Sequence, residues 1–190
     1  MFAFKKNYFL IIENTKDIDL SNIKKHNKFL VIYRNLGKRE EIFKLIRFRK
    51  KCRLKQIKFF VANNYHLASL LNSDGIYLSA HNKSLKALNF KRLNYSIIGS
   101  AHNFNEIFLK KKQGCDYILL SRLFFVSYKK ELNYLNLTKY NKYSTVFKNL
   151  LPLGGINILN LNKMKSINCE AFAIYSEIKK KPAKIFSRLF

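Results

Sequence analysis

A chain of 190 residues with 48% hydrophobic and 25% charged side chains can bury a core without disulfide or metal support, which excludes wholesale disorder. Its charge is unbalanced, because 37 Lys and Arg stand against 11 Asp and Glu for a formal charge of +26. This excess favours an anionic partner, whether nucleic acid, anionic lipid or a phosphorylated metabolite. Basic residues occur in every segment, however, and accompany other residues with AT-rich codons. Solvated faces are therefore favoured over a dedicated nucleic-acid stripe.

The cysteines and apolar runs indicate a cytoplasmic protein. The three cysteines are far apart and form no CxxC pair, so neither a zinc site nor a disulfide framework is predicted: Cys52, Cys115 and Cys169. The apolar run at residues 8–12 is too short for a secretory signal, and residues 117–126 are too short and too polar to span a membrane.

Eight short runs rich in β-branched and aromatic residues recur along the chain. In order, they are residues 8–12, 29–33, 59–61, 75–78, 96–99, 117–120, 150–153 and 171–175. Most are nearly continuous apolar runs, a pattern typical of parallel strands that are covered on both faces.

Helical patterns separate these runs. The apolar residues of segment 40–48 repeat at helical spacing, with lysine and arginine on the other face: Ile42, Phe43, Leu45 and Ile46. Segment 103–112 begins with Asn103 as a cap, has Glu106 three residues later and ends before Gly114. Residues 15–28 leave room only for a short first helix, and residues 179–190 are expected to form a final barrel helix in preference to a membrane-surface segment.

Strand and helix alternating about eight times predict an α/β fold. The expected architecture is a small (β/α)₈ TIM barrel with a short first helix, as one domain of residues 1–190. An open doubly wound sheet is the main alternative. A parallel barrel carries its chemistry at the C-terminal ends of its strands, so the residues that follow each run are the candidates for a site.

The strand-end motifs, in their order and spacing, resemble the thiamine phosphate synthase and TenI-type thiazole tautomerase family over roughly residues 8–178. The motifs are Tyr33-Arg34-Asn35, Val61-Ala62-Asn63-Asn64, Asp74-Gly75-Ile76-Tyr77-Leu78, Ile98-Gly99-Ser100-Ala101-His102, Gly114-Cys115-Asp116-Tyr117-Ile118 and Gly154-Gly155-Ile156. The resemblance implies a transferase that joins an aminopyrimidine diphosphate to a thiazole phosphate and releases diphosphate with the help of Mg²⁺. On that resemblance, Arg34, Ser100 and Lys129 correspond to the groups that hold the diphosphate.

The sequence departs from the family at the metal site. The two family aspartates that hold Mg²⁺ fall on Asn63 and Asn82, and the family asparagine before the first falls on Ala62. Two negative charges are lost, and hard cations depend on such charge. No cofactor is therefore expected, and Mg²⁺ only as a weakly bound ion.

Other positions depart as well. The family threonines fall on Val126 and Tyr128, and the histidine of the tautomerases falls on Arg122. His102, with Asn63 and Asn64, is expected to line the substrate pocket. A histidine there could act as acid and base, or could simply be a polar residue at a strand end.

A phosphate cup is expected at Gly154 and Gly155, together with Ser176 at the start of a helix. The alternative is a Gly-Gly turn beside a helix that Glu177 caps, since a carboxylate there would satisfy the same amides.

Three functions are then open. The first is a thiamine phosphate synthase-like protein with reduced or altered activity on phosphorylated thiamine precursors. The second is a non-catalytic relative that binds a phosphorylated ligand or a protein partner. The third and least favoured is a nucleic-acid binder, because the aromatic residues of the basic stretch 43–51 are expected in the core.

Overall fold

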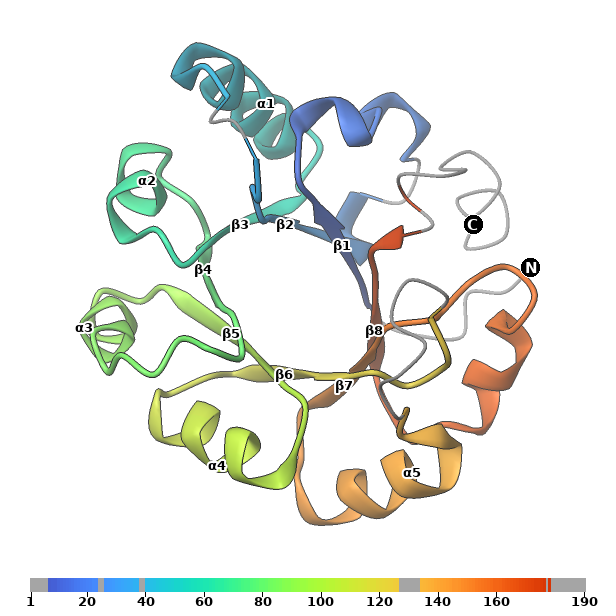
Figure 1. The fold of residues 1–190 in the computed structure, drawn as a ribbon. Helices are drawn as coiled ribbons and strands as arrows, with labels where there is room; N and C mark the ends of the chain where they lie inside the picture. Colours follow the sequence, from blue (N-terminus) through green and yellow to red (C-terminus); the bar gives the residue numbers. More distant parts are fainter. Residues whose placement is uncertain (1–6, 24–25, 38–39, 127–133, 177, 179–190) are drawn as a thin grey trace.

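The computed structural model describes residues 7–23, 26–37, 40–126, 134–176 and 178. Eight parallel strands form a closed barrel in chain order (Figure 1). They are β1 (Asn7–Ile12), β2 (Phe29–Tyr33), β3 (Lys58–Ala62), β4 (Gly75–Leu78), β5 (Ser96–Ala101), β6 (Tyr117–Ser121), β7 (Leu150–Leu153) and β8 (Ala171–Ile174). Strand β1 closes the ring, because Leu10 pairs with Val31 of β2 on one side and with Ile174 of β8 on the other. The predicted barrel is confirmed, and the open sheet is wrong.

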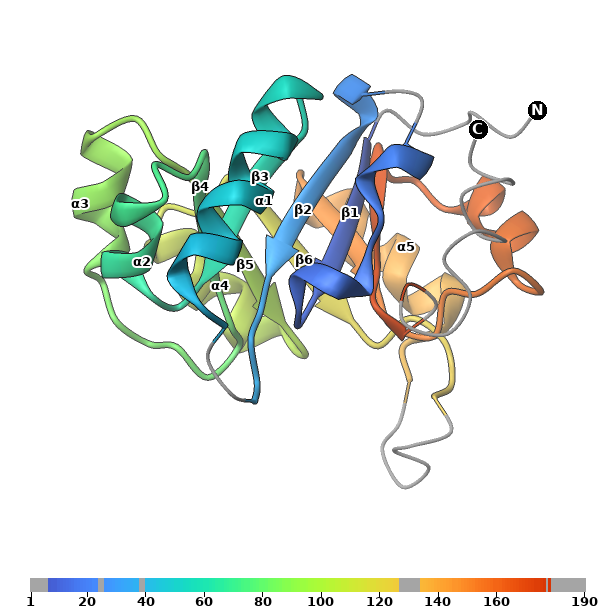
Figure 2. The same ribbon diagram turned by 90° about the horizontal axis from the view of Figure 1, so that it is seen from above.

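Helices surround the barrel. In the described part of the chain they are α1 (Ile42–Leu54), α2 (Tyr65–Leu70), α3 (Ala87–Arg92), α4 (Phe104–Lys112) and α5 (Asn136–Val146). Figure 2 shows α1 lying along the outside of β2 and β3. The predicted start of α4 is confirmed, since the Asn103 side chain accepts a hydrogen bond from the Glu106 amide at 2.9 Å. The helix predicted over 179–190 lies outside the described residues.

Short 3₁₀ turns take the place of the expected first helix. Between β1 and β2 lie Thr15–Asp17, Leu20–Asn22 and His26–Lys28, and between β7 and β8 lies Leu161–Ser166. The side chains of Asn14 and Asp19 accept hydrogen bonds from the amides of Lys16 and Ser21, each at 2.9 Å. Such local side-chain bonds compete with an α-helix and end each turn after a few residues.

Helix α1 buries only part of the face that its apolar pattern predicts. Its buried residues are Leu45, Phe48, Arg49 and Cys52, whereas Phe43 is 73% exposed and Ile46 is 44% exposed. Arg49 can be buried because its Nη2 donates to the Asn72 carbonyl and to Asp74, both at 3.0 Å. The expectation of a core position is therefore wrong for Phe43 and Ile46, whereas Leu45 and Phe48 are buried as expected.

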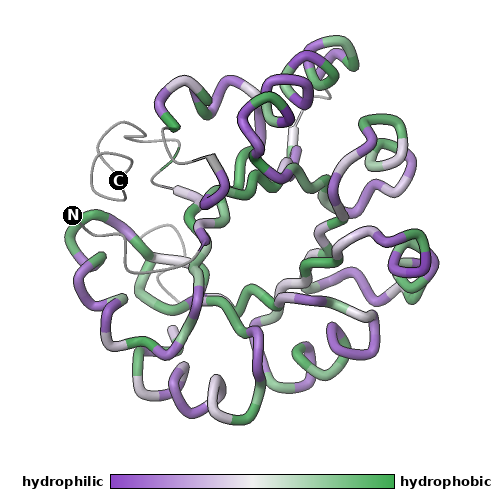
Figure 3. The backbone as a smooth tube through the Cα atoms, turned by 180° about the vertical axis from the view of Figure 1, so that it is seen from behind, coloured by the Kyte–Doolittle hydropathy of each residue, from purple (hydrophilic) through white to green (hydrophobic). Residues whose placement is uncertain are grey.

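Alternate strand residues fill the barrel. Figure 3 shows that the ring of strands is largely hydrophobic. The interior cluster consists of Phe9, Ile11, Leu30, Ile32, Phe60, Tyr77, Ile98, Leu119, Leu151, Ala171 and Ala173. A packed interior leaves the strand ends as the place for a ligand. Within the described residues, every helix is too short or too polar to cross a bilayer.

Candidate functional site

A pocket of about 540 Å³ opens at the C-terminal ends of the strands. We call it the mouth pocket. Its apolar lining includes Ile11, Tyr77 and Ala173 from the barrel interior and Leu153 at the end of β7. Polar groups from six strand ends surround it: Arg34, Ser79, His81, Ser100, His102, Ser121, Arg122, Gly154, Gly155, Tyr175 and Ser176. The strand-end rule for parallel barrels therefore locates the site.

The mouth pocket brings together six of the residues predicted from the sequence: Arg34, Ser100, His102, Gly154, Gly155 and Ser176. The amides Asn63, Asn64 and Asn82 are not among its lining residues. The Asn64 side chain instead caps α2, where it accepts a hydrogen bond from the Leu67 amide at 2.9 Å. Lys129 and Glu177 lie outside the described residues.

Positive charge dominates the mouth pocket. Arg34 and Arg122 both line it, and its described lining contains no carboxylate. Arg34 makes no ion pair with any described residue. Below it, burial raises the pKa of the Tyr77 phenol, while a hydrogen bond from Ser100 and the charge of Arg34 act in the opposite direction. The arrangement offers guanidinium and hydroxyl donors to an anion.

Two glycines form one wall of the mouth pocket. Gly154 and Gly155 have φ angles of +93° and +72°, a region that L side chains rarely adopt. A Cβ atom on Gly155 would lie 2.6 Å from the Phe124 carbonyl oxygen. The Gly154 carbonyl accepts a hydrogen bond from the Phe124 amide at 3.1 Å, so the loop after β6 is held against this turn. Only glycine fits both the conformation and the close approach.

His102 is held at the end of β5 by two oxygens of one residue. Its Nδ1 lies 2.9 Å from the Ser121 hydroxyl and 3.2 Å from the Ser121 carbonyl oxygen. Its backbone amide donates to Glu106 Oε2 at 2.7 Å. Because Nδ1 is occupied, Nε2 is the ring nitrogen left for a ligand or a proton.

Asn63 and Asn82, which the resemblance assigns to the metal positions of the family, form a hydrogen bond with each other. Asn82 Nδ2 donates to Asn63 Oδ1 at 3.0 Å, and the Ser79 amide donates to the same oxygen at 3.0 Å. Asn63 Nδ2 donates to the Ser79 hydroxyl at 3.1 Å. We call this set, Asn63, Ser79 and Asn82, the amide clasp. Asn63 Oδ1 already accepts two hydrogen bonds and carries no charge, so the residues of the amide clasp do not fit Mg²⁺. The described residues also contain no cluster of three or more His, Cys, Asp or Glu side chains that could hold a metal.

Sequence reasoning did not assign Arg122, His81 or Tyr175 to the site, although all three line the mouth pocket. Arg122 directly follows β6 and Tyr175 directly follows β8. For Arg122 the position after a predicted strand was the signal that could have identified it, whereas the predicted run 171–175 placed Tyr175 inside a strand. His81 lies in the loop between β4 and α3, and no local pattern distinguishes it from other loop residues.

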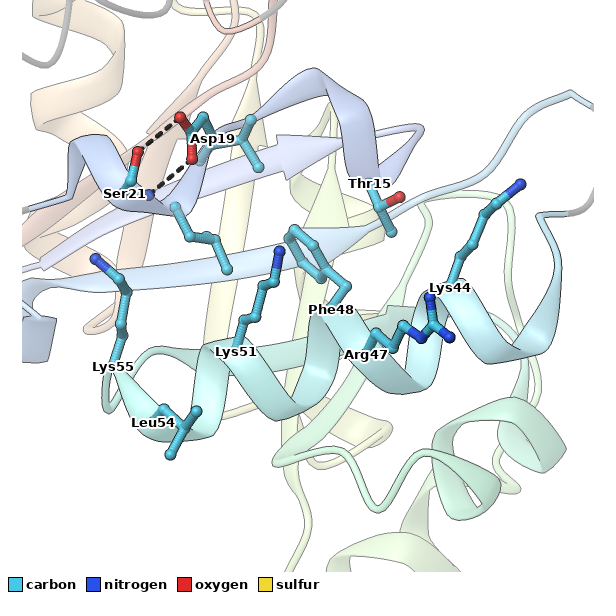
Figure 4. A pocket seen from close by; sticks show the side chains of 11 residues that line it. Thr15, Asp19, Ser21, Lys44, Arg47, Phe48, Lys51, Leu54 and Lys55 are labelled. Atoms are coloured by element: carbon cyan, nitrogen blue, oxygen red, sulfur yellow. Dashed lines mark hydrogen bonds between the residues drawn. The ribbon is translucent and has the colours of Figure 1, made fainter.

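A second cavity, of about 480 Å³, lies on the outer surface of the molecule. Figure 4 shows it between α1 and the 3₁₀ turns that follow β1. Its cations lie three or four residues apart on one face of α1: Lys44, Arg47, Lys51 and Lys55. Asp19, on the opposite wall, accepts hydrogen bonds from the Ser21 amide and hydroxyl. We call this region the basic groove.

Comparison with protein families and comparison with known sequences both match the chain to thiamine phosphate synthases. The family model described as thiamine monophosphate synthase matches residues 20–178. A thiamine-phosphate synthase of Clostridioides difficile (strain 630) is 24% identical over 77% of this chain and 71% of its own length. One from Prochlorococcus marinus subsp. pastoris is 32% identical over 73% of this chain, but the match spans only 40% of that relative.

Comparison with solved structures confirms the architecture. A thiamine phosphate pyrophosphorylase from Pyrococcus furiosus matches with a TM-score of 0.76 and 17% identity, over 97% of this chain and 93% of that one. A 3-hexulose-6-phosphate synthase matches with a TM-score of 0.71 and 9% identity, over 96% of this chain and 97% of that one. At such identities the likeness shows the fold alone.

Proposed function

Because the chain belongs to the thiamine monophosphate synthase family, we propose that its mouth pocket binds phosphorylated thiamine precursors and joins them as a thiamine phosphate synthase does, with altered activity. The single observation that carries the proposal is the pair Arg34 and Arg122 in a pocket whose described lining has no carboxylate. A diphosphate is the anion that such a pair of forked donors suits.

The proposed chemistry places the diphosphate of the aminopyrimidine against the arginines. As the bond from carbon to the diphosphate breaks, its electron pair leaves with the diphosphate, and the ring nitrogen of the thiazole supplies the electron pair of the new bond to that carbon. Negative charge therefore grows on the diphosphate. Arg34 and Arg122 stabilise that charge, and the Ser100 hydroxyl is a further donor in the same pocket. The amide clasp offers no site for a metal ion, so these cations and hydroxyls supply the stabilisation themselves. Lys129 would add to them on the resemblance alone.

The thiazole phosphate would lie at the turn after β7, next to Arg122, since a Cβ atom on Gly154 would be 3.0 Å from Arg122 Cγ. The Gly154–Gly155 turn exposes backbone without side chains, and Ser176 lies beside it in the same pocket. Backbone amides and a serine hydroxyl are donors that suit a phosphate monoester. The two anionic groups would thus both lie near Arg122, which follows β6 and packs against the turn after β7.

The test is a diphosphate-release assay on the full chain with both precursors, in chelator and in a series of Mg²⁺ concentrations. We expect turnover with little dependence on Mg²⁺. Binding of each precursor is measured separately by calorimetry. Failure to bind either precursor would contradict the proposal, whatever the metal concentration.

The amide clasp favours a second candidate, a non-catalytic relative that binds a phosphorylated ligand. Neutral amides paired with each other cannot replace the carboxylates that assist the departure of diphosphate. Calorimetric binding of both precursors with no release of diphosphate at any Mg²⁺ concentration would select this candidate over the first.

A further inference from the structure

A buried lysine connects α4 to the loop that carries two of the clasp residues. The side chain of Lys110 is 0% exposed. Its Nζ donates to the Ser79 carbonyl at 2.7 Å, to the Asn82 carbonyl at 2.7 Å and to Gln113 Oε1 at 2.9 Å. These three oxygens satisfy all three donors of the ammonium group. The lysine is thus a cation inside the molecule, coordinated much as a free ion would be.

Gln113 strengthens the same connection. Its Nε2 donates to the Asn82 carbonyl at 2.9 Å and to the Ser84 carbonyl at 2.8 Å. Like Lys110 it is fully buried. Two side chains one turn apart on the C-terminal end of α4 therefore hold three carbonyls of the loop between β4 and α3.

Burial of an ammonium group is costly unless its hydrogen bonds and charge are compensated. No described carboxylate forms an ion pair with Lys110. Packing of α4 does not require a charge at this position, since Ile107 supplies an apolar contact on the same buried face. The ammonium group instead binds the loop between β4 and α3. Ser79 and His81 of that loop line the mouth pocket.

We propose that Lys110 is a positioning residue, whose ammonium group acts as an internal cation that fixes the loop from Ser79 to Ser84 and so sets one wall of the mouth pocket. It does so without contacting the ligand. The amide clasp completes the arrangement from the other side, because Asn63 binds Ser79 and Asn82. The effect on ligand binding rests on the proposed function, whereas the effect on the loop does not.

The first test replaces Lys110 with Met, which keeps an apolar stem and removes the charge, and uses Lys112→Met as the control because Lys112 is exposed. We expect amide hydrogen exchange in residues 79–84 to become about tenfold faster in Lys110→Met, with inorganic diphosphate bound about tenfold more weakly. Unchanged exchange in residues 79–84 would overturn the proposal. If the unaltered protein binds no diphosphate, the proposed function fails and the exchange result alone decides the role of Lys110.

A second test separates a cation from mere packing. Ethylammonium should slow the exchange of residues 79–84 in Lys110→Ala, because it supplies an ammonium group to the vacated space. Ethanol of similar size, and sodium chloride at equal ionic strength, should not. Equal effects of ethylammonium and ethanol would overturn the proposal. If neither Lys110 variant folds, Gln113→Met keeps the charge but removes one acceptor of the ammonium group and the two hydrogen bonds that Gln113 itself donates to the loop. It should speed exchange in residues 79–84. No change in that variant would also overturn it.

Discussion

The mouth pocket and the basic groove have similar volumes, about 540 and 480 Å³, and both are rich in cations. They differ in the origin of their charges. Arg34 and Arg122 follow β2 and β6, are half-buried, and line the same pocket over a floor of packed strand residues. The cations of the basic groove lie along one helix, and most are exposed. The comparison teaches that charges from different strand ends that line one pocket favour a binding site, whereas charges repeated along one helix favour a solvated face.

The largest effect should come from the two arginines of the mouth pocket. The double substitution Arg34→Ala with Arg122→Ala removes two charged donors, each worth about 1.5–3 kcal/mol. We expect binding of inorganic diphosphate to weaken by about 100-fold or more, as measured by calorimetry. The control Arg47→Ala removes an arginine from the basic groove and should leave that affinity within about twofold. An equal loss in both proteins would remove the distinction between the regions.

The next largest effect should come from the wall of the mouth pocket. Gly155→Ala places a Cβ atom 2.6 Å from the Phe124 carbonyl oxygen at a φ of +72°. We expect a loss of about 2–3 kcal/mol in the free energy of unfolding, measured by urea denaturation. Gly37→Ala is the matched control, because a Cβ there meets nothing within 4 Å. If both substitutions cost the same, the wall is not strained by close packing.

The third effect concerns the buried face of α1 and not the face that borders the basic groove. High pH should lower the stability of the protein through Cys52, which lies on that buried face. Burial raises the pKa of the Cys52 thiol from 9.0 to about 12. The unfolded chain therefore releases this proton at a lower pH than the folded chain, so stability is constant at neutral pH and falls from about pH 9 towards pH 12, by about 1.4 kcal/mol per pH unit for this group. Urea denaturation at several pH values should show a shallower fall in Cys52→Ala. If the two proteins lost stability with pH at the same rate, the Cys52 thiol would ionise as readily in the folded protein as in the unfolded chain.

The smallest effect should come from the basic groove itself. Replacement of all four of its cations with glutamine should change the free energy of unfolding by less than about 0.5 kcal/mol for each substitution. Binding of diphosphate at the mouth pocket should stay the same. Single-stranded RNA should bind weakly to both proteins at physiological salt. Tight binding lost only in the substituted protein would show that the groove is a nucleic-acid site after all.

Local patterns were sufficient for the barrel and for much of the mouth pocket. Buried parallel strands produce continuous apolar runs, and the strand-end rule then indicates which segments to inspect without knowledge of any tertiary contact. The choice of Arg34 and Ser100 within those segments came from the resemblance to the family. The burial of the Arg49 and Lys110 side chains could not be predicted in this way. Each depends on oxygens far away in the sequence, at Asp74 for the arginine and at Ser79 for the lysine. Their charges alone argue for exposure.

The pairing of Asn63 with Asn82 was also beyond the sequence. The sequence indicated only that two carboxylates were missing. The structure adds that the amides occupy each other and hold the loop that lines the pocket. Complementary hydrogen bonding between two loops requires their relative positions, which no periodicity encodes.

The bridge made by Lys110 has a consequence for how the protein responds to its surroundings. The ammonium group of Lys110 is covalently part of the chain, so each molecule carries one. Chelators and a shortage of divalent ions cannot remove it. Loss of its proton is the only way to discharge it, and its three oxygen acceptors are satisfied by the protonated form. The loop should therefore keep its shape over the whole range of ion supply that a cell experiences.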